Sequence, residues 1–256
     1  MRVAVFGAAG WLGRAIITNM EVGHDVVAVD LSSSSWEKWD DIDPNWDGEL
    51  IHGDITDYAH VEEVISGVDS VVHATVYSGS QPGSYGIDDM NPFQINLKGL
   101  WNILEVARKK QIRRVVHVGS CQTVHPRGIF FDAEIRRPDG SMYAVTKRLQ
   151  EEMCRQFYEA FGLSIIILRP DYIVDSRLGI GKNREKLGSV HGNSLRNGWV
   201  CRHDLAEAAK LAIEANHISF DILHVVGTPE AEKTCNARRA RELLGLQYST
   251  DLQRFR

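Results

Sequence analysis

Long apolar runs, paired cysteines and an excess of positive charge are all missing from this chain of 256 residues. No apolar stretch reaches the roughly 18 residues of a membrane-spanning helix, so the sequence predicts no membrane segment. The net charge of -5 gives no basic surface of the kind that binds nucleic acid or anionic membranes. We therefore expect a cytoplasmic protein whose partner is a small molecule, with neither nucleic acid nor a membrane as a partner.

Cysteine is also scarce, with 4 residues in the chain. Cys121, Cys154, Cys201 and Cys235 lie far apart in the sequence, without a Cys-x-x-Cys pair or a zinc-type spacing. This spacing favours reduced thiols over a disulfide framework. It also predicts that the protein holds no metal ion.

Glycine, by contrast, is concentrated in a Gly-x-x-Gly-x-x-Gly pattern near the N-terminus. An apolar, β-branched run over residues 1–6 precedes the pattern, and a helical repeat of apolar residues follows it, so a strand, a turn and a helix are expected. Glycines allow a close backbone approach, and the unpaired N–H groups at a helix start attract phosphate. The predicted pyrophosphate contacts are Gly7, Gly10, Trp11, Leu12 and Gly13.

The second expected strand, residues 26–30, ends on the carboxylate of Asp30. Asp30 follows the glycine pattern by about 20 residues, where a carboxylate binds the ribose 2′-hydroxyl of a dinucleotide. A 2′-phosphate would be repelled there, and no Lys or Arg follows before Lys38. The cofactor is therefore predicted to be NAD. If NADP bound instead, the serine run at 32–35 would be its phosphate site.

A second motif, Tyr143-Ala-Val-Thr-Lys147, lies on an expected helix over residues 142–161. Residues four apart share a helix face, so the Lys147 ammonium is expected one turn from the Tyr143 phenol. A free phenol has a pKa of about 10 and is a poor base at neutral pH. A nearby cation favours its ionised form, so this pair predicts proton transfer coupled to hydride transfer at an alcohol or carbonyl carbon.

Strands and helices alternate along the chain, which predicts an α/β fold with a mostly parallel, doubly wound Rossmann-type sheet. We expect an NAD-binding core over residues 1–168 and a small substrate-binding lobe over residues 169–256, interleaved with the last sheet elements as a single compact unit. Ligands bind at the carboxyl ends of parallel strands. Further strands are expected at residues 50–53, 70–74, 114–118 and 164–168, and further helices at 61–65 and 93–109.

In their order along the chain, these motifs resemble the extended short-chain dehydrogenase/reductase superfamily, also called the NAD-dependent epimerase/dehydratase family. The matching segments are the glycine pattern, Gly53-Asp54-Ile55, Val72-His73-Ala74, Asn96-x-x-Gly99-x-x-Asn102, Val118-Gly119-Ser120, Tyr143-x-x-x-Lys147, Arg169-Pro170 and His203-Asp204-Leu205-Ala206.

The resemblance implies roles for particular residues. Asp54 would lie by the adenine, with Ile55 and Ala74 as further cofactor contacts. Ser120 would orient the substrate oxygen, Tyr143 would take its proton, and Lys147 would hold the nicotinamide ribose. Thr123 is the alternative to Ser120, and His125 the alternative base. His73 and Asn96 are interpreted as structural, a satisfied strand-end imidazole and a loop-tying amide.

Departures from the family narrow the reaction. Dehydratases of the family carry Asp-Glu after the serine position, but Cys121-Gln122 stand here, so dehydration is not expected. The short stretch after Leu168 favours a substrate smaller than a nucleotide sugar. Residues 137–140 (Arg-Pro-Asp-Gly) resemble uronate dehydrogenases, although that subfamily has Asn-His after the serine. The candidate substrate contacts are Thr75, Ser120, Gln122 and Arg177, with Lys182, Arg184, Lys186 and Arg196 as further basic residues that could meet a carboxylate.

The sequence thus predicts an NAD-dependent oxidoreductase acting on a hydroxyl or carbonyl carbon of a small sugar or sugar acid. Two alternatives stay open: a sugar or nucleotide-sugar epimerase with tightly bound NAD, and a non-catalytic dinucleotide-binding sensor. A homodimer is also expected, because the family pairs two long helices across a dimer interface. The apolar residues on those helices are Leu97, Leu100, Trp101, Leu104, Met153 and Phe157.

Overall fold

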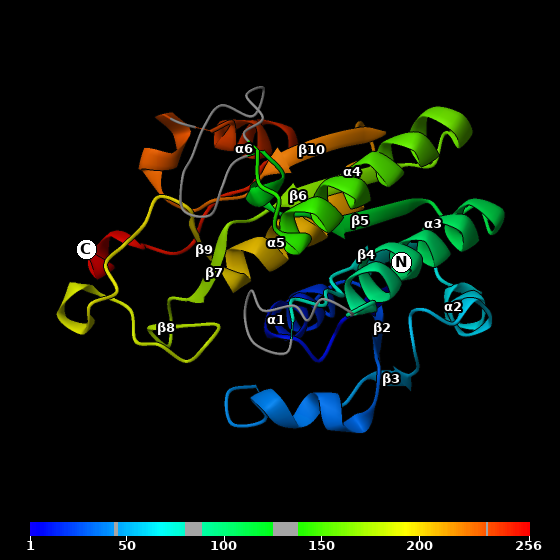
Figure 1. Ribbon diagram of the computed structural model, residues 1–256, viewed down its shortest axis with the longest axis horizontal. Helices are drawn as coiled ribbons and strands as arrows, with labels where there is room; N and C mark the ends of the chain where they lie inside the picture. The colour runs from blue at the N-terminus through cyan, green and yellow to red at the C-terminus, as the bar shows by residue number, and fades with distance from the viewer. Residues whose placement is uncertain (44–45, 80–88, 125–137, 234) are drawn as a thin grey trace.

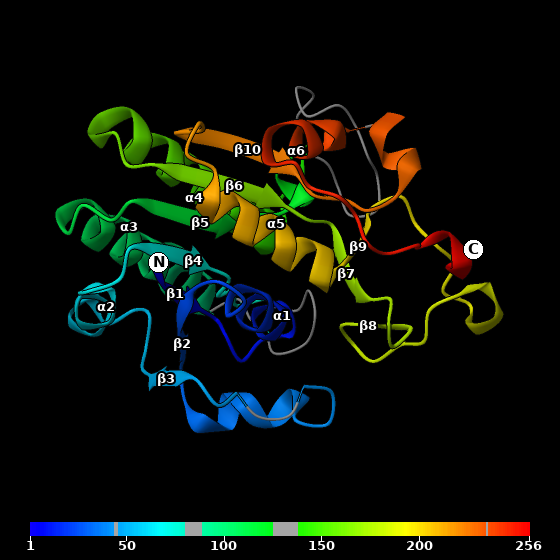
Figure 2. The ribbon, with the colours of Figure 1, turned by 180° about the vertical axis from the view of Figure 1, so that it is seen from behind.

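A computed structural model describes residues 1–43, 46–79, 89–124, 138–233 and 235–256. Its centre is a seven-stranded sheet in the order β10-β6-β5-β4-β1-β2-β3, in which all neighbouring strands run parallel. Helices cover both faces of the sheet (Figures 1 and 2). The predicted doubly wound α/β fold is confirmed.

The strands of the main sheet are β1 (Arg2–Phe6), β2 (Asp25–Asp30), β3 (Glu49–His52), β4 (Ser70–His73), β5 (Arg114–Val118), β6 (Ile165–Arg169) and β10 (Phe220–His224). The α-helices are α1 (Trp11–Met20), α2 (Tyr58–Ile65), α3 (Gly99–Lys109), α4 (Met142–Phe161), α5 (Arg202–Glu214) and α6 (Ala237–Leu244). Shorter helical segments are η1 (Ser33–Trp39), η2 (Pro92–Lys98), η3 (Cys121–Thr123), η4 (Ser189–His191), η5 (Pro229–Lys233) and η6 (Gln253–Phe255).

The hydrophobic core forms two layers, one on each face of the sheet. Alternate residues of a strand point to opposite faces, and β1 illustrates this: Val3 and Val5 pack with α1, α5 and α6, whereas Ala4 and Phe6 pack with α2, α3 and α4. Since both faces are covered, the central strands are apolar throughout instead of alternating with polar residues.

Helix α4 begins and ends on recognisable signals. The Ser141 hydroxyl accepts a hydrogen bond from the Ala144 N–H at 3.3 Å, and Gly162 ends the helix with a left-handed backbone at φ 68°. The predicted bounds of this helix are confirmed. As a result, Tyr143 lies in the first turn of α4 and Lys147 one turn later.

The helix expected over residues 93–109 differs from the structure in its first part. It begins as the wider π-helical segment η2 and becomes an α-helix only at Gly99. In η2 the Asn96 side chain accepts from the Tyr77 N–H at 2.8 Å and donates to the Tyr77 carbonyl at 3.0 Å. The interpretation of Asn96 as a loop-tying amide is thereby confirmed.

The segment after β6 both completes the core and builds a small second sheet. Strand β10 pairs with β6, and α5 packs against α1, so residues 169–256 are interleaved with the core. The second sheet consists of β7 (Tyr172–Asp175), β8 (Ile180–Gly181) and β9 (Trp199–Cys201). It lies beyond the carboxyl ends of the main strands, on the right in Figure 2.

The apolar stripe proposed for a dimer interface is largely core. Leu100 and Leu104 are fully buried between α3 and the sheet, and Phe157 is buried with them. Trp101 is 40% exposed on the outer face of α3. The stripe is therefore part of the core at Leu100, Leu104 and Phe157, while the homodimer itself stays a prediction.

No helix in the described ranges has both the length and the apolar character needed to span a membrane. Two residues named from the sequence, His125 and Arg137, lie outside the described residues.

Candidate functional site

The glycine pattern forms a tight turn between β1 and α1. Gly7 has a φ of +85°, and a Cβ atom there would lie 2.7 Å from the Thr75 nitrogen; a Cβ at Gly13 would lie 2.0 Å from the Gly7 carbonyl oxygen. Only glycine fits both positions. Gly10 caps α1 without any side-chain hydrogen bond, so the first N–H groups of the helix remain available to an anion.

Side chains of the glycine turn point inward. Trp11 and Leu12 are both buried, and the Trp11 indole N–H donates to the Ile173 carbonyl at 3.1 Å. Cofactor contacts at these two residues would therefore come from the backbone. The turn also meets the end of β4, since the Ala74 N–H donates to the Phe6 carbonyl at 2.9 Å and Thr75 lies against Gly7.

Two predicted carboxylates lie at the ends of neighbouring strands. The Asp30 carboxylate accepts from the Ala9 N–H at 2.9 Å and from the Leu31 N–H at 2.8 Å, which ties the end of β2 to the glycine turn. The Gly53 N–H donates to the Asp30 carbonyl at 3.0 Å, so the chain reaches Asp54 one residue after this contact with Asp30. Ile55 packs against Gly99, where a Cβ would lie 2.7 Å from its Cγ2. The predicted adenosine contacts are thus brought together along one edge of the sheet.

Ser120 lies just after the carboxyl end of β5, and Tyr143 lies in the first turn of α4. Burial raises the pKa of Tyr143, and a hydrogen bond with the Ser120 side chain lowers it in part. The Ser120 hydroxyl also accepts from the Gln122 N–H at 3.2 Å. Thr123, the alternative to Ser120, is fully buried and donates its hydroxyl to the Ser120 carbonyl at 2.9 Å, so this hydroxyl proton is already engaged by the backbone.

Lys147 is buried and donates from Nζ to the Val118 carbonyl at 2.9 Å. Burial lowers the pKa of Lys147 to about 8, partly offset by the Glu151 carboxylate one turn further along α4. The expected lowering of the phenol pKa by Lys147 is not found in this state, because burial dominates and the pKa of Tyr143 is raised. The ammonium is directed to a backbone carbonyl instead.

Asp171 is a residue near Tyr143 that the sequence reasoning did not single out. It lies two residues after the end of β6, and the Cys121 N–H donates to the neighbouring Pro170 carbonyl at 2.9 Å. The negative charge of Asp171 contributes to the raised pKa values of Tyr143 and Cys121, so the carboxylate lies in their electrostatic reach. Its place at the carboxyl end of a parallel strand was a signal available in the sequence.

The two remaining substrate candidates lie in different surroundings. Gln122 donates from Nε2 to Asp139 at 3.5 Å, close to the start of α4. The Arg177 side chain is 61% exposed; its Nε lies 3.8 Å from the buried Asp175, and its guanidinium also contacts His203. Arg177 thus lies in the turn between β7 and β8, where its side chain is near Asp175 and His203.

Asp175 belongs to a buried ion cluster that joins the second sheet to the glycine turn. Arg202 is fully buried and donates from Nε to Asp175 at 2.7 Å and from Nη1 to the Trp11 carbonyl at 3.2 Å. Arg202 also pairs with Asp43, from the segment that follows η1. Burial alone would raise the pKa of Asp175, but hydrogen bonds from His203 and Arg202 and the Arg202 charge hold it well below the usual carboxyl range.

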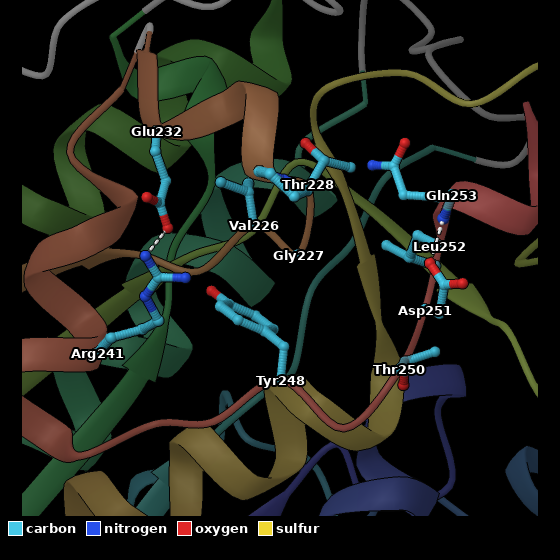
Figure 3. A pocket seen from close by; sticks show the side chains of 11 residues that line it. Val226, Gly227, Thr228, Glu232, Arg241, Tyr248, Thr250, Asp251, Leu252 and Gln253 are labelled. Carbon is cyan, nitrogen blue, oxygen red and sulfur yellow. Dashed lines mark hydrogen bonds and ion pairs between the residues drawn. The ribbon is translucent and has the colours of Figure 1, made fainter.

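A separate cavity of about 180 Å³ lies between the end of β10, α6 and the C-terminal segment (Figure 3). Arg241 and Glu232 form an ion pair on one side of it. The Tyr248 hydroxyl points between them and Val226, and burial raises the pKa of Tyr248. The lining contains none of the residues predicted to bind cofactor or substrate, so this cavity is distinct from the Ser120–Tyr143–Lys147 site.

The sequence of residues 3–197 matches the model of the NAD dependent epimerase/dehydratase family. The chain belongs to this family. The predicted family is thereby confirmed. The family is NAD-dependent, which agrees with the cofactor predicted from the glycine turn and Asp30. The match includes the glycine turn, Ser120, Tyr143 and Lys147.

Among individual proteins, the chain is similar to a uronate dehydrogenase of Pseudomonas putida, with 25% identity over 66% of this chain and 59% of that protein. It is also similar to an L-arabinose 1-dehydrogenase (NAD(P)(+)) of Haloferax volcanii, with 25% identity over 84% of this chain and 83% of that protein. The matched stretch thus spans less than two thirds of the uronate dehydrogenase.

Solved structures share the fold across the whole chain. The UDP-glucuronic acid 4-epimerase of Bacillus cereus, in complex with NAD, superposes with a TM-score of 0.77 at 16% identity, covering 100% of this chain and 96% of that one. The uronate dehydrogenase of Agrobacterium tumefaciens gives a TM-score of 0.73 at 22% identity, covering 99% and 86%.

Proposed function

We propose that this protein is an NAD-dependent oxidoreductase that transfers hydride between the nicotinamide and a hydroxyl or carbonyl carbon of a small sugar or sugar acid. The observation that carries the proposal is the meeting of Ser120, Tyr143 and Lys147 at the carboxyl end of β5, on the same sheet edge as the glycine turn. Uronate and arabinose dehydrogenases among the similar proteins support the substrate class.

The residues present fit a dinucleotide. The glycine turn leaves no space for a Cβ at Gly7 or Gly13, and the start of α1 carries no side-chain cap, so backbone N–H groups would hold the pyrophosphate. Asp30 would accept from the adenosine ribose, Asp54 and Ile55 would lie by the adenine with Ala74, and Lys147 would hold the nicotinamide ribose. When bound, NAD supplies the hydride acceptor.

The chain's own residues would handle the proton. Tyr143 accepts the proton of the substrate hydroxyl, and Ser120 orients that oxygen through its own hydroxyl. The raised pKa of Tyr143 in the present surroundings makes the phenol a weak acid. A Lys147 ammonium brought nearer by the ribose would favour the phenolate, because an opposite charge within about 4–6 Å stabilises the ionised form.

A substrate panel tests this function. NADH absorbance is followed with neutral sugars, polyols and uronic acids, with Tyr143→Phe as the matched control. We expect NADH formation with at least one sugar or sugar acid, and a rate lower by roughly 10² to 10⁴ with the control. Absence of NADH formation across the panel, together with no NAD binding by calorimetry, would overturn the proposal.

The same panel distinguishes the alternatives left by the sequence. An epimerase would be purified with bound NAD and would interconvert sugars without net NADH. A dinucleotide sensor would bind NAD and convert nothing. Either result would refute the dehydrogenase assignment.

Arg177 is proposed to meet the carboxylate of a sugar acid. Arg177→Gln is then expected to raise KM for a sugar acid while leaving KM for a neutral sugar unchanged, because only the acid loses an ion pair. Arg155→Gln, which removes an exposed cation that lies over the Phe220 ring, serves as the control. Equal effects of Arg177→Gln on both substrates would contradict this role.

A further inference from the structure

Two buried histidines form a pair that the proposed chemistry does not use. His73 and His117 occupy paired positions on β4 and β5, and both side chains are fully buried. Their Nδ1 atoms are 2.8 Å apart, and the rings stack with centroids 5.0 Å apart. The expectation of a satisfied imidazole at His73 is met at Nδ1 only, since Nε2 has no hydrogen-bond partner among the described residues.

Both imidazoles lie on the sheet face that α2, α3 and α4 cover. Residues two apart on a strand share a face, and Val71 and Val115, two positions earlier on β4 and β5, pack in the cluster that contains residues of α4. Lys147 and Gln150 extend from that helix. Lys147 binds the Val118 carbonyl, one residue after His117.

Both rings are neutral at physiological pH. Burial, followed by the Lys147 charge, lowers the pKa of His73 to about 3 and that of His117 well below its usual value. A hydrogen bond between two neutral Nδ1 atoms needs one N–H and one lone pair. The two histidines must therefore be opposite tautomers, so that one Nε2 carries a proton and the other a lone pair.

Gln150 decides which tautomer belongs to which ring. Its Nε2 donates to the Asn96 carbonyl at 2.6 Å, so its Oε1 is left to accept, and that buried oxygen has no partner in the described part of the chain. His117 Nε2 is likewise buried without a partner in the described ranges, and the Gln150 side chain partly raises the otherwise lowered pKa of His117. A donor at His117 Nε2 satisfies both atoms at once.

We propose that His73 and His117 are positioning residues for Lys147: His117 donates from Nε2 to Gln150 Oε1, His73 donates from Nδ1 to His117, and the Nε2 lone pair of His73 accepts from the Lys147 ammonium. The resulting hydrogen-bond chain runs from Lys147 through both strands to Asn96 in η2. It stabilises the charged, correctly directed form of Lys147. The importance of that form for turnover rests on the function proposed above.

The first test is ¹⁵N NMR of the histidines in the wild-type protein, with resonances assigned from the single variants. We expect one neutral Nδ1–H ring at His73 and one neutral Nε2–H ring at His117, unchanged from pH 8 to pH 6. Identical tautomers, the reverse assignment, or protonation of either ring at pH 6 would overturn the proposal. This readout needs no substrate, so its failure is separable from failure of the proposed function.

The second test uses two variants of His73 that each keep one half of its hydrogen bonding. His73→Gln keeps an acceptor near the Nε2 position, whereas His73→Asn keeps only a donor near Nδ1. The Lys147 midpoint is followed by ¹³Cε NMR, with the signal assigned by its loss in Lys147→Met.

His73→Asn is expected to lower the Lys147 midpoint by about one pH unit, a tenfold change in the ratio of charged to neutral amine. His73→Gln should leave it near the wild-type value. The titratable side chains that raise the pKa of Lys147, Glu151 and Cys154, are unchanged in both variants, as is His117. Equal midpoints in the two variants would refute the role of the His73 lone pair, and unfolding midpoints check that both are folded.

Discussion

The Arg169 guanidinium holds the Glu151 carboxylate by two parallel hydrogen bonds, Nε to Oε1 at 2.7 Å and Nη2 to Oε2 at 2.6 Å. Both side chains are buried. The pair joins the end of β6 to α4, one turn beyond Lys147. It therefore connects the stability of the fold to the electrostatics of the site.

Replacing Glu151 with Gln should destabilise the protein by about 3–5 kcal/mol, because Arg169 would keep its charge without a partner inside the core. The pKa of Lys147 should fall further below about 8, since Glu151 is the main group that raises it. Chemical denaturation measures the first effect and NMR titration the second. Glu152→Gln, at the next and exposed position of α4, should change neither the stability nor the Lys147 pKa. An equal loss of stability in both variants would contradict the role of the Arg169–Glu151 pair.

Replacing Tyr143 with Phe removes the phenol oxygen and keeps the ring. Turnover should fall by roughly 10² to 10⁴, the usual contribution of a general acid or base, with NAD affinity unchanged. Steady-state kinetics and calorimetry make the comparison. Near-normal turnover on a confirmed substrate would mean that another group is the base, and His125 would be the next candidate.

Replacing Lys147 with Met should weaken NAD binding and move the activity profile to higher pH, because the phenol loses its cation. In the wild type, the amine is charged below its pKa of about 8 and neutral above it. NAD affinity should therefore decrease as the pH rises through about 8. A wild-type affinity that is constant from pH 6 to pH 10 would exclude a ribose contact by the ammonium.

Asp30 should make the protein prefer NAD over NADP by at least about tenfold, or 1.4 kcal/mol. Its carboxylate lies at the end of β2 with two backbone N–H groups as partners and would repel a 2′-phosphate. Asp30→Asn should narrow the preference, whereas Asp25→Asn, at the opposite end of the same strand, should not. Calorimetry with both cofactors tests this; equal or tighter NADP binding by the wild type would refute it.

Replacing Asp175 with Asn should destabilise the protein by about 3–5 kcal/mol near neutral pH, because Arg202 is fully buried. The pKa of Asp175 is lower in the folded protein than in the unfolded chain, so its stabilisation is present above about pH 4 and is lost as the pH falls. The difference between variant and wild type should shrink in acid. Asp41→Asn, in an exposed pair with Arg184, is the control, and a pH-independent difference would contradict the argument.

Local sequence patterns predicted most of the core. The apolar strand before Gly7, the helical repeat after Gly10 and the bounds of α4 all depend on neighbours a few residues apart, and the structure agrees with them. The placement of Tyr143 and Lys147 on one helix face likewise depends only on residues four apart in the sequence. The family and the fold class could therefore be inferred from the sequence.

Contacts between distant segments were not available from such patterns. The spacing of Leu100 and Leu104 is compatible with a core face or with a dimer interface, and only packing against the sheet showed that they are core. Nothing in the local sequence distinguishes Arg202 from other basic residues. Only the folded chain brings Asp43 and Asp175 to its guanidinium.

Local patterns were enough to predict a Rossmann-type sheet, a glycine turn and a tyrosine one helical turn from a lysine, because helix and strand periods act over a few residues. Packing placed the Val118 carbonyl and Glu151 next to Lys147, and it buried His73 and His117 where the Lys147 charge lowers their pKa values further. These groups come from separate strands and helices. Burial and neighbouring charge set their pKa values, and both exist only once the chain has packed.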